Sequence, residues 1–169
     1  MTPPEPRFEE VVREHAGDLY RYAFWLARDR QQAEDVVQEA LLRGWRAFPR
    51  LRDRAAIKTW LFAIVRNEFY RLVAKSVLHA DSVDVAELDI ADERAGLFGL
   101  EMREALMALP VSYAEPLALQ VLGGFSCAEI AGMLGTTEGA VMTRLTRARQ
   151  TLRRLIAPGT ARERRGGRS

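Results

Sequence analysis

The sequence is poor in the residues that cross-link proteins, bind metals or span membranes. It contains one cysteine, Cys127, and two histidines, His15 and His79, which excludes an internal disulfide and predicts no zinc site. No uninterrupted apolar run is longer than the six residues 60–65, whereas a membrane-spanning helix needs roughly 20 such residues. The acidic, proline-containing start is unlike a secretory signal. We therefore expect a cytoplasmic protein with no membrane insertion, no metal, no cofactor and no small-molecule substrate.

Strand-like alternation is also missing, and apolar residues recur at helical spacing instead. The 169 residues, 48% of them hydrophobic and 28% charged, suffice for one medium or two small globular domains. Three helices are predicted over about residues 6–28, 30–47 and 56–75, with Asp29 as a cap of the second and Pro49 in the loop before the third. The residues expected to face the core are Phe8, Val11, Val12, His15, Leu19, Tyr22, Val37, Leu41, Trp45, Phe48, Ile57, Trp60, Leu61, Ile64, Val65 and Leu72.

A second helical block follows a segment without sustained periodicity. Ser112 with Glu115, and Ser126 with Glu129, have the spacing of capping boxes at helix starts. Pro116 is expected in the first turn of its helix, where the missing N–H matters least. Four helices are predicted in this block, over about residues 100–109, 112–122, 127–134 and 138–156.

The formal net charge of +2 is unevenly distributed along the chain. Residues 1–75 carry +3, residues 76–98 carry −5 and residues 99–169 carry +4. The acidic middle segment has no sustained helical face, so we interpret it as a flexible linker. The basic tail, residues 158–169, is expected to be disordered. The predicted fold class is all-α, with a helical bundle over residues 1–75 and a second small helical domain over 99–157, joined by the linker.

The second domain contains a candidate helix-turn-helix at Ala131, Gly135 and Val141. Such a motif needs a small residue where two helices cross, glycine in the turn and an apolar residue on the second helix. A plain helical hairpin, packed only for stability, is the structural alternative. However, hydroxyl and guanidinium groups cover the outward face of the second helix, and nine arginines oppose one glutamate between Arg144 and Arg168. Such groups bind phosphates and base edges, which favours DNA binding.

Two surfaces of the first domain are further candidate interfaces. The second helix carries a polar face with Asp35, Gln38 and Glu39, followed by Arg43; ion pairs within an exposed helix are the structural alternative. The outer side of the third helix is basic and aromatic, which suits single-stranded bases and their backbone. Basic side chains that merely surround a bundle core are the alternative there. The residues of this outer side are Lys58, Phe62, Arg66, Asn67, Tyr70, Arg71 and Lys75.

Four segments carry a family likeness. They are AEDVVQEALLRGWRAF at 33–48, TWLFAIVRN at 59–67, ALPVSYAEPLAL at 108–119 and FSCAEIAGMLGTTEGAVMTRLTRARQTLRR at 125–154. In this order and spacing the chain, from about residue 8 to 156, resembles a bacterial extracytoplasmic-function (ECF) RNA polymerase sigma factor. The run Arg-Asn-Glu-Phe-Tyr at 66–70 is also similar to the general-stress subgroup of that family.

The resemblance implies an alternative sigma factor that joins RNA polymerase core and directs it to promoters. The first domain would bind the clamp helices of the large catalytic subunit and melt the minus-ten element. The second would contact the flap and read the minus-35 element, and an anti-sigma protein would inhibit both. The implied contacts are Asp35, Gln38, Glu39 and Arg43 for the core, Arg54, Lys58, Phe62, Arg66, Asn67, Tyr70 and Arg71 for the minus-ten element, and Thr137, Met142, Thr143, Arg144, Thr146, Arg147 and Arg149 for the minus-35 element.

The chain departs from the family pattern at a few positions. Arg71 and Ala74 stand where many relatives carry an acid and an arginine, Met142 where a basic residue is common, and Ala114 where arginine is frequent. These departures leave the target promoter sequence open. They do not touch the residues that carry the resemblance.

Three other functions are alternatives. An enzyme would need a nucleophile with a base, and Cys127 has no histidine near it in sequence. A sigma-like decoy that binds only an anti-sigma protein would be expected to lose the basic surface that Arg144 and Arg147 retain. A helix-turn-helix repressor would usually dimerise, and no heptad seam for a dimer is present. We therefore expect a sigma factor and not an enzyme.

Overall fold

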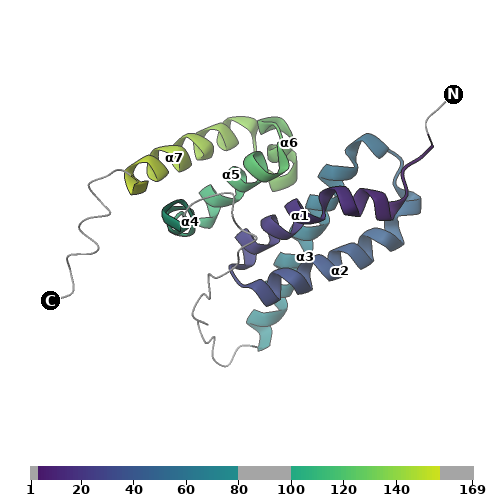
Figure 1. Cartoon of the computed structure of the whole chain (residues 1–169). Helices are drawn as coiled ribbons and strands as arrows, with labels where there is room; N and C mark the ends of the chain where they lie inside the picture. The colour runs from purple at the N-terminus through teal and green to yellow at the C-terminus, as the bar shows by residue number, and fades with distance from the viewer. Residues whose placement is uncertain (1–3, 80–99, 157–169) are drawn as a thin grey trace. The chain divides into compact units, whose positions relative to one another are not determined.

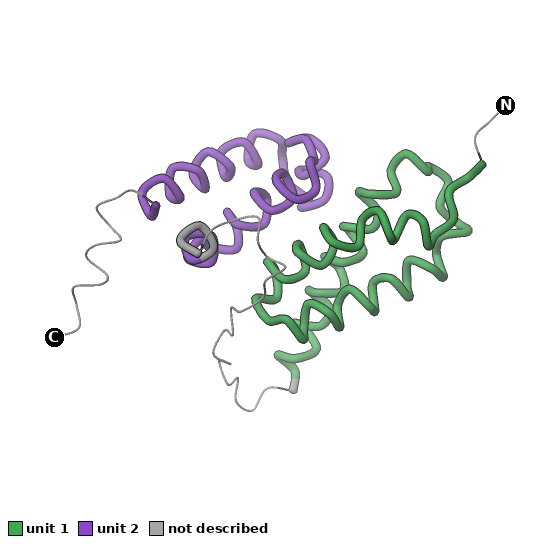
Figure 2. Tube along the Cα trace, viewed as in Figure 1, with its two compact units in different colours: residues 1–88 green, residues 89–169 purple. Residues whose placement is uncertain are grey.

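The structure, a computed structural model, describes residues 4–79 and 100–156 (Figure 1). Every regular element in these two ranges is helical, which confirms the all-α prediction. The chain divides into two compact units, residues 1–88 and 89–169 (Figure 2). The predicted linker and basic tail lie mostly outside the described residues.

Unit 1 is a bundle of three helices, α1 (Phe8–Ala27), α2 (Arg30–Ala47) and α3 (Ile57–His79), each of which packs on the other two. Two short 3₁₀ turns, η1 (Phe48–Arg50) and η2 (Arg54–Ala56), connect α2 to α3. The bundle core contains Leu19, Tyr22, Leu61, Phe62 and Val65, all fully buried. The rings of Tyr22 and Phe62 lie 5.4 Å apart between centroids. Burial of these large side chains supplies most of the favourable free energy of a bundle this small.

The ends of α2 and α3 follow from local chemistry. The Asp29 carboxylate accepts a hydrogen bond from the backbone N–H of Gln32 at 2.8 Å, which confirms the predicted cap of α2. Helix α3 continues to His79, past the predicted end at residue 75, so the start of the predicted linker is helical. Its last turns carry exposed Val77 and Leu78.

The predicted core of α2 and α3 needs two corrections. Trp45 is 60% exposed and Leu72 is 37% exposed, although both were expected to face inward. In α2 the inward position is the neighbouring Gly44, whose missing side chain lets the Phe8 ring approach to 3.3 Å from where a Cβ would stand. Since successive helical residues are about 100° apart, Trp45 is turned out of the bundle.

Unit 2 comprises α4 (Leu100–Met107), α5 (Val111–Gly123), α6 (Cys127–Leu134) and α7 (Glu138–Ile156). Helix α7 packs against the other three. The small core that results is apolar and nearly free of solvent contact. It is formed by Leu119, Ile130, Val141, Leu145 and Ala148.

The predicted capping box at the start of α5 is wrong, whereas the predicted Ser126 cap at the start of α6 is confirmed. Helix α5 begins at Val111 after Pro110, without a side-chain cap, and the Glu115 side chain is buried. Proline sets the backbone angle of a helix start by itself, so Ser112 is not needed as a cap. Pro116 consequently lies inside α5, beyond the first turn where it was expected. At α6 the Ser126 hydroxyl does accept from the N–H of Glu129 at 3.2 Å.

Candidate nucleic-acid and protein interfaces

The turn between α6 and α7 has the geometry that the sequence predicts. Gly135 closes α6 at φ +63, a left-handed conformation that favours glycine, and its N–H donates to the carbonyl of Ala131. The Thr137 hydroxyl accepts from the N–H of Ala140 at 3.2 Å and so begins α7. Ala131 and Val141 are buried at the crossing of the two helices. The predicted helix-turn-helix motif is therefore present.

The outward face of α7 is exposed along its length. Met142 is 56% exposed, and Thr143, Thr146 and Arg147 are exposed with it. The Thr143 hydroxyl donates to the backbone carbonyl of Gly139 at 3.0 Å, and the Thr146 hydroxyl donates to that of Met142 at 2.9 Å. Arg147 has no hydrogen bond or ion pair to another residue in the part of the chain that the structure describes. Its guanidinium group is available to an anionic partner.

Two other predicted DNA contacts of unit 2 differ from Arg147 in their surroundings. The Arg149 guanidinium donates to the side-chain oxygen of Gln120 on α5, which anchors it between two helices. Arg144 is half-buried on α7. Among the predicted minus-35 residues, Met142, Thr143, Thr146 and Arg147 are exposed and lie on one side of α7. We call these four residues the α7 reading face.

On α2, the predicted polar face extends into exposed apolar side chains. Asp35 and Gln38 are exposed, and Asp35 accepts a hydrogen bond from the Gln31 side chain at 3.1 Å. Further along the same side of the helix lie Leu42 and Trp45, both more than half exposed. The sequence placed Trp45 in the core and so missed this surface. An exposed tryptophan beside an exposed leucine is typical of a protein interface.

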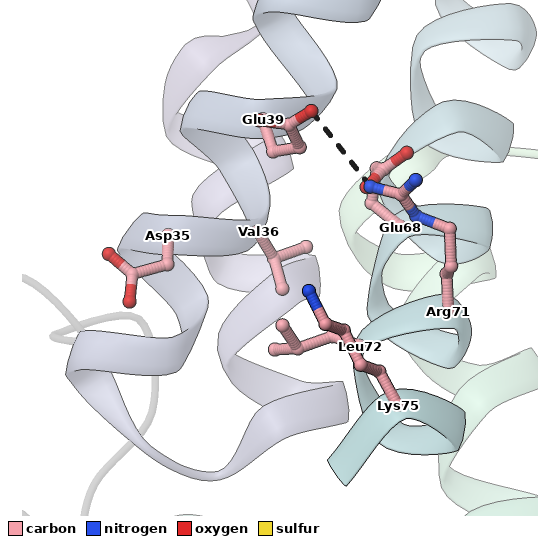
Figure 3. A pocket seen from close by; sticks show the side chains of 7 residues that line it. All are labelled: Asp35, Val36, Glu39, Glu68, Arg71, Leu72 and Lys75. Carbon is pink, nitrogen blue, oxygen red and sulfur yellow. Dashed lines mark hydrogen bonds and ion pairs between the residues drawn. The ribbon is translucent and has the colours of Figure 1, made fainter. Parts of the chain in front are cut away.

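Helices α2 and α3 enclose an open pocket of about 340 Å³. Figure 3 shows Glu39 of α2 and Arg71 of α3 pointing toward one another across it, with Asp35 turned away. Charged groups of both signs surround two apolar residues at its base. The lining residues are Asp35, Val36, Glu39, Glu68, Arg71, Leu72 and Lys75.

Glu68 joins the charged side chains of this pocket. Its side chain is 7% exposed, and it forms ion pairs with Arg43 of α2 and, at 3.0 Å, with Arg71. Both arginines also approach the Glu39 carboxylate, Arg43 at 3.4 Å and Arg71 at 3.9 Å. Arg43 and Arg71, predicted to bind polymerase and DNA, are therefore engaged inside unit 1. The sequence signal for Glu68, which we missed, is that it is the lone acid in α3.

The connection between α2 and α3 is also held by internal contacts. The guanidinium of Arg54 lies 4.0 Å from the centre of the Phe48 ring, and one of its nitrogens lies 3.8 Å from the Glu5 carboxylate. The Phe48 ring in turn packs on Phe8, with 5.3 Å between centroids. Arg54, a predicted DNA contact, thus fixes the loop at residues 48–56 to the body of the bundle.

The outer side of α3 retains most of the predicted residues but not Phe62. That side chain is 0% exposed, so its predicted outward position is wrong. Leu61, Phe62, Val65 and Phe69 form the inward stripe, which is rotated about the helix axis relative to the inward face predicted from the sequence. Asn67 is exposed, Lys58 and Arg66 are half-buried, and the Arg66 guanidinium lies 4.6 Å from the centre of the Tyr70 ring.

Two other kinds of site, a membrane span and a metal centre, are missing from the part of the chain that the structure describes. Across residues 4–79 and 100–156, the helices are all too short or too polar to cross a membrane. In the same ranges no three histidine, cysteine or acidic side chains gather in a way that could hold a metal ion.

Comparison with protein families gives two matches that follow the division into units. The model of Sigma-70 region 2 matches residues 11–77, and that of Sigma-70 region 4 matches residues 99–152. Among curated proteins, the ECF RNA polymerase sigma factor SigL of Mycobacterium tuberculosis is 37% identical, covering 83% of each chain. SigM of the same species is 32% identical over 88% of this chain and 76% of its own.

Solved structures give the same result. The sigma factor RpoE from Bartonella quintana, in complex with the anti-sigma factor NepR, matches with a TM-score of 0.78 and 29% identity, covering 89% of this chain and 97% of that one. CnrH, in complex with the cytosolic domain of CnrY, matches with a TM-score of 0.60 and 25% identity, covering 88% and 86%.

Proposed function

Because this chain belongs to the ECF branch of the sigma-70 family, we propose a division of labour in which each unit makes its own contacts to polymerase and promoter. The chain is an alternative sigma factor that directs promoter-specific transcription. Sigma factors are not known to catalyse a reaction. We therefore propose that this chain acts entirely by binding, in the cytoplasm, as a subunit of the polymerase holoenzyme.

Unit 1 binds the polymerase core through the exposed side of α2. The surface combines the polar residues Asp35, Gln38 and Glu39 with the exposed Leu42 and Trp45. Interfaces commonly surround a large aromatic anchor with polar contacts that fix orientation. The clamp helices of the large catalytic subunit are the partner that the family resemblance implies. Glu68, Arg43 and Arg71 support this surface from the pocket behind it.

Unit 1 also engages the opened minus-ten element. The loop at residues 48–56 and the outer side of α3 offer Asn67, Lys58 and the stacked pair of Arg66 and Tyr70. Aromatic and guanidinium planes stack on unpaired bases, and amides hydrogen-bond to their edges. Phe62 takes no part in this contact while it remains in the bundle core.

Unit 2 reads the minus-35 element as intact duplex. In helix-turn-helix proteins the second helix enters the major groove, and here that helix is α7. The guanidinium of Arg147, exposed and without a partner among the described residues, carries this proposal, because it stands on the α7 reading face where a groove-bound helix needs a donor. We propose that Arg149, which is anchored by Gln120, contacts a phosphate beside the groove.

An anti-sigma protein is the proposed inhibitor. One of the similar structures is a complex of a sigma factor with such a protein, RpoE with the anti-sigma factor NepR. Inhibition would follow if a partner covered the α2 surface that we assign to polymerase. A free chain titrated with its inhibitor would then lose binding to core.

Run-off transcription with purified core polymerase tests the proposal. We expect the full chain to start RNA synthesis on a subset of genomic promoters, where core alone does not. Arg147→Ala should reduce initiation at minus-35-dependent promoters, while a pull-down shows unchanged binding to core. Initiation no better than bare core would contradict the proposal. If such an inactive chain still bound an anti-sigma protein, a decoy function would replace it.

A further inference from the structure

The hydroxyl hydrogens on the α7 reading face are already used inside the helix. Thr143 donates to the carbonyl of Gly139 and Thr146 to that of Met142, at 3.0 and 2.9 Å. A hydroxyl has a single hydrogen to donate. Neither threonine can therefore donate to a base while these bonds persist; each can offer only a hydroxyl oxygen as an acceptor and its methyl group.

The third exposed side chain in this group is also apolar. Met142 stands next to Thr143 and one turn before Thr146, so the three side chains share one side of α7. Methionine has no donor and only a weak acceptor. The centre of the reading face is thus apolar, and the strong donor beside it is Arg147.

In the major groove this chemistry points to one base. Guanine presents only acceptors, which require a donor, and adenine and cytosine each present an amino donor that Met142 at the centre of this face is poorly suited to accept; thymine alone presents a methyl group that makes apolar contacts. We propose that Met142, Thr143 and Thr146 read thymine C5-methyl groups in the minus-35 element, with Arg147 supplying the hydrogen bonds. The inference rests on the proposed function of α7 and adds the class of base that it selects.

The test uses holoenzyme assembled from core polymerase and the full chain. Promoter duplexes with a randomised minus-35 region are selected for binding, and each thymine of the selected sequence is then replaced by deoxyuridine, which lacks only the methyl group. We expect at least one replacement to weaken binding by about 3- to 5-fold, the effect of one buried methyl. Because the base-pairing edge is unchanged, the loss reports the methyl contact alone.

Matched substitutions assign that contact to its side chain. Thr143→Val and Thr146→Val keep the methyl and remove the hydroxyl, whereas Thr143→Ser and Thr146→Ser do the reverse. The readout is the affinity ratio between thymine and deoxyuridine promoters. We expect the valine variants to retain the ratio and at least one serine variant to bring it close to 1.

The outcomes separate this inference from the function on which it rests. A holoenzyme that selects no minus-35 sequence would overturn both. A selected sequence that contains no thymine, or whose thymines are all replaced without loss, would overturn the methyl reading alone. The methyl reading would also be overturned if the valine variants bound thymine and deoxyuridine promoters equally while the serine variants still preferred thymine. The hydroxyl groups, and not the methyl groups, would then recognise the base.

Discussion

At the scale of single residues, Glu68 holds two arginines of unit 1 in internal ion pairs. Its buried carboxylate holds Arg43 and Arg71, and through them it restrains Glu39 at the edge of the polymerase-binding surface. A buried carboxylate between two guanidinium groups is stable only while all three remain charged and paired. The spacing of three residues between Glu68 and Arg71 is visible in the sequence, whereas the pairing of Glu68 with Arg43 depends on the packing of α3 against α2.

Replacing that carboxylate should destabilise unit 1. We expect Glu68→Gln to lower the free energy of unfolding of this unit by about 1–3 kcal/mol, because Arg43 and Arg71 lose their shared ion pair. Tryptophan fluorescence in urea measures unit 1 selectively, since the chain's three tryptophans all lie in it. Glu9→Gln, at an exposed position of α1, is the control. Equal effects of the two substitutions would refute a special role for Glu68.

Gly139 in the first turn of α7 is a second residue with a consequence for function. Nothing lies within 4 Å of where its Cβ would stand, so packing does not require glycine there. Alanine should stabilise the helix by about 0.5–1 kcal/mol. We nevertheless expect Gly139→Ala to weaken minus-35 binding several-fold, because the added methyl would stand where DNA approaches the reading face.

Hydrogen exchange of α7 and binding of holoenzyme to minus-35 duplex measure these two effects of Gly139→Ala separately. Gly132→Ala is the matched control, since Gly132 on α6 also has open space around it and lies outside the reading face. If Gly139→Ala slows hydrogen exchange but leaves DNA binding undiminished, the space beside Gly139 is not occupied by DNA in the complex.

Exposure of single residues was harder to predict than their chemistry. The sequence predicted an exposed Phe62 and a buried Trp45, whereas Phe62 is buried and Trp45 is exposed. The spacing of apolar residues in α3 fits an inward stripe in more than one direction around the helix, and packing against Tyr22 places Phe62 in the core. For Trp45 the deciding neighbour is Gly44, which a pattern of large apolar residues does not count as core.

At the scale of elements, helix existence was predictable and helix starts only partly so. Asp29 and Ser126 act as predicted caps because side-chain acceptors at those positions are strong local signals. At α5, Pro110 provides a competing start, so the spacing of Ser112 and Glu115 was misleading. The turn at Gly135 was predicted correctly because few residues other than glycine adopt its left-handed backbone.

Alanine substitutions at Gly135 in this turn and at Gly132 in α6 should change stability in opposite directions. Gly135→Ala should destabilise the α6–α7 motif by about 1 kcal/mol, since alanine is strained at φ +63. Gly132→Ala, within helix α6, should instead stabilise it by about 0.5–1 kcal/mol. Hydrogen exchange of amides in residues 127–156 measures both. A shift in the same direction for both variants would contradict the left-handed turn.

Helix α2 carries a prediction about the polymerase. Because Trp45 is mostly outside the bundle core, Trp45→Ala should change the unfolding free energy little but lower the affinity for core polymerase at least about tenfold. Competition binding with labelled chain measures the affinity. Val77→Ala, an exposed apolar residue of α3 outside the proposed surface, is the control. An unchanged affinity for Trp45→Ala would remove this residue from the interface.

At the scale of the whole molecule, the protein consists of two small units, and each unit has only a small core. The two units act together because one chain connects them. The sequence predicted this division from charge and from two separate family motifs, and both motifs coincide with a compact unit. A covalent connection raises the effective concentration of the second unit once the first has bound. Weak individual contacts can then give strong promoter selection.

The division also predicts how defects combine. Trp45→Ala acts through polymerase and Arg147→Ala through the minus-35 duplex, and the two residues lie in different units. Effects of independent sites add as free energies to within about 0.3–0.5 kcal/mol. In run-off transcription titrated with sigma factor and promoter, the fold-losses of the double variant should therefore be the product of the single losses. If the double variant instead transcribes as well as the less active of the two single variants, α2 and α7 act in one shared step. Loss of either contact would then already remove the contribution of the other.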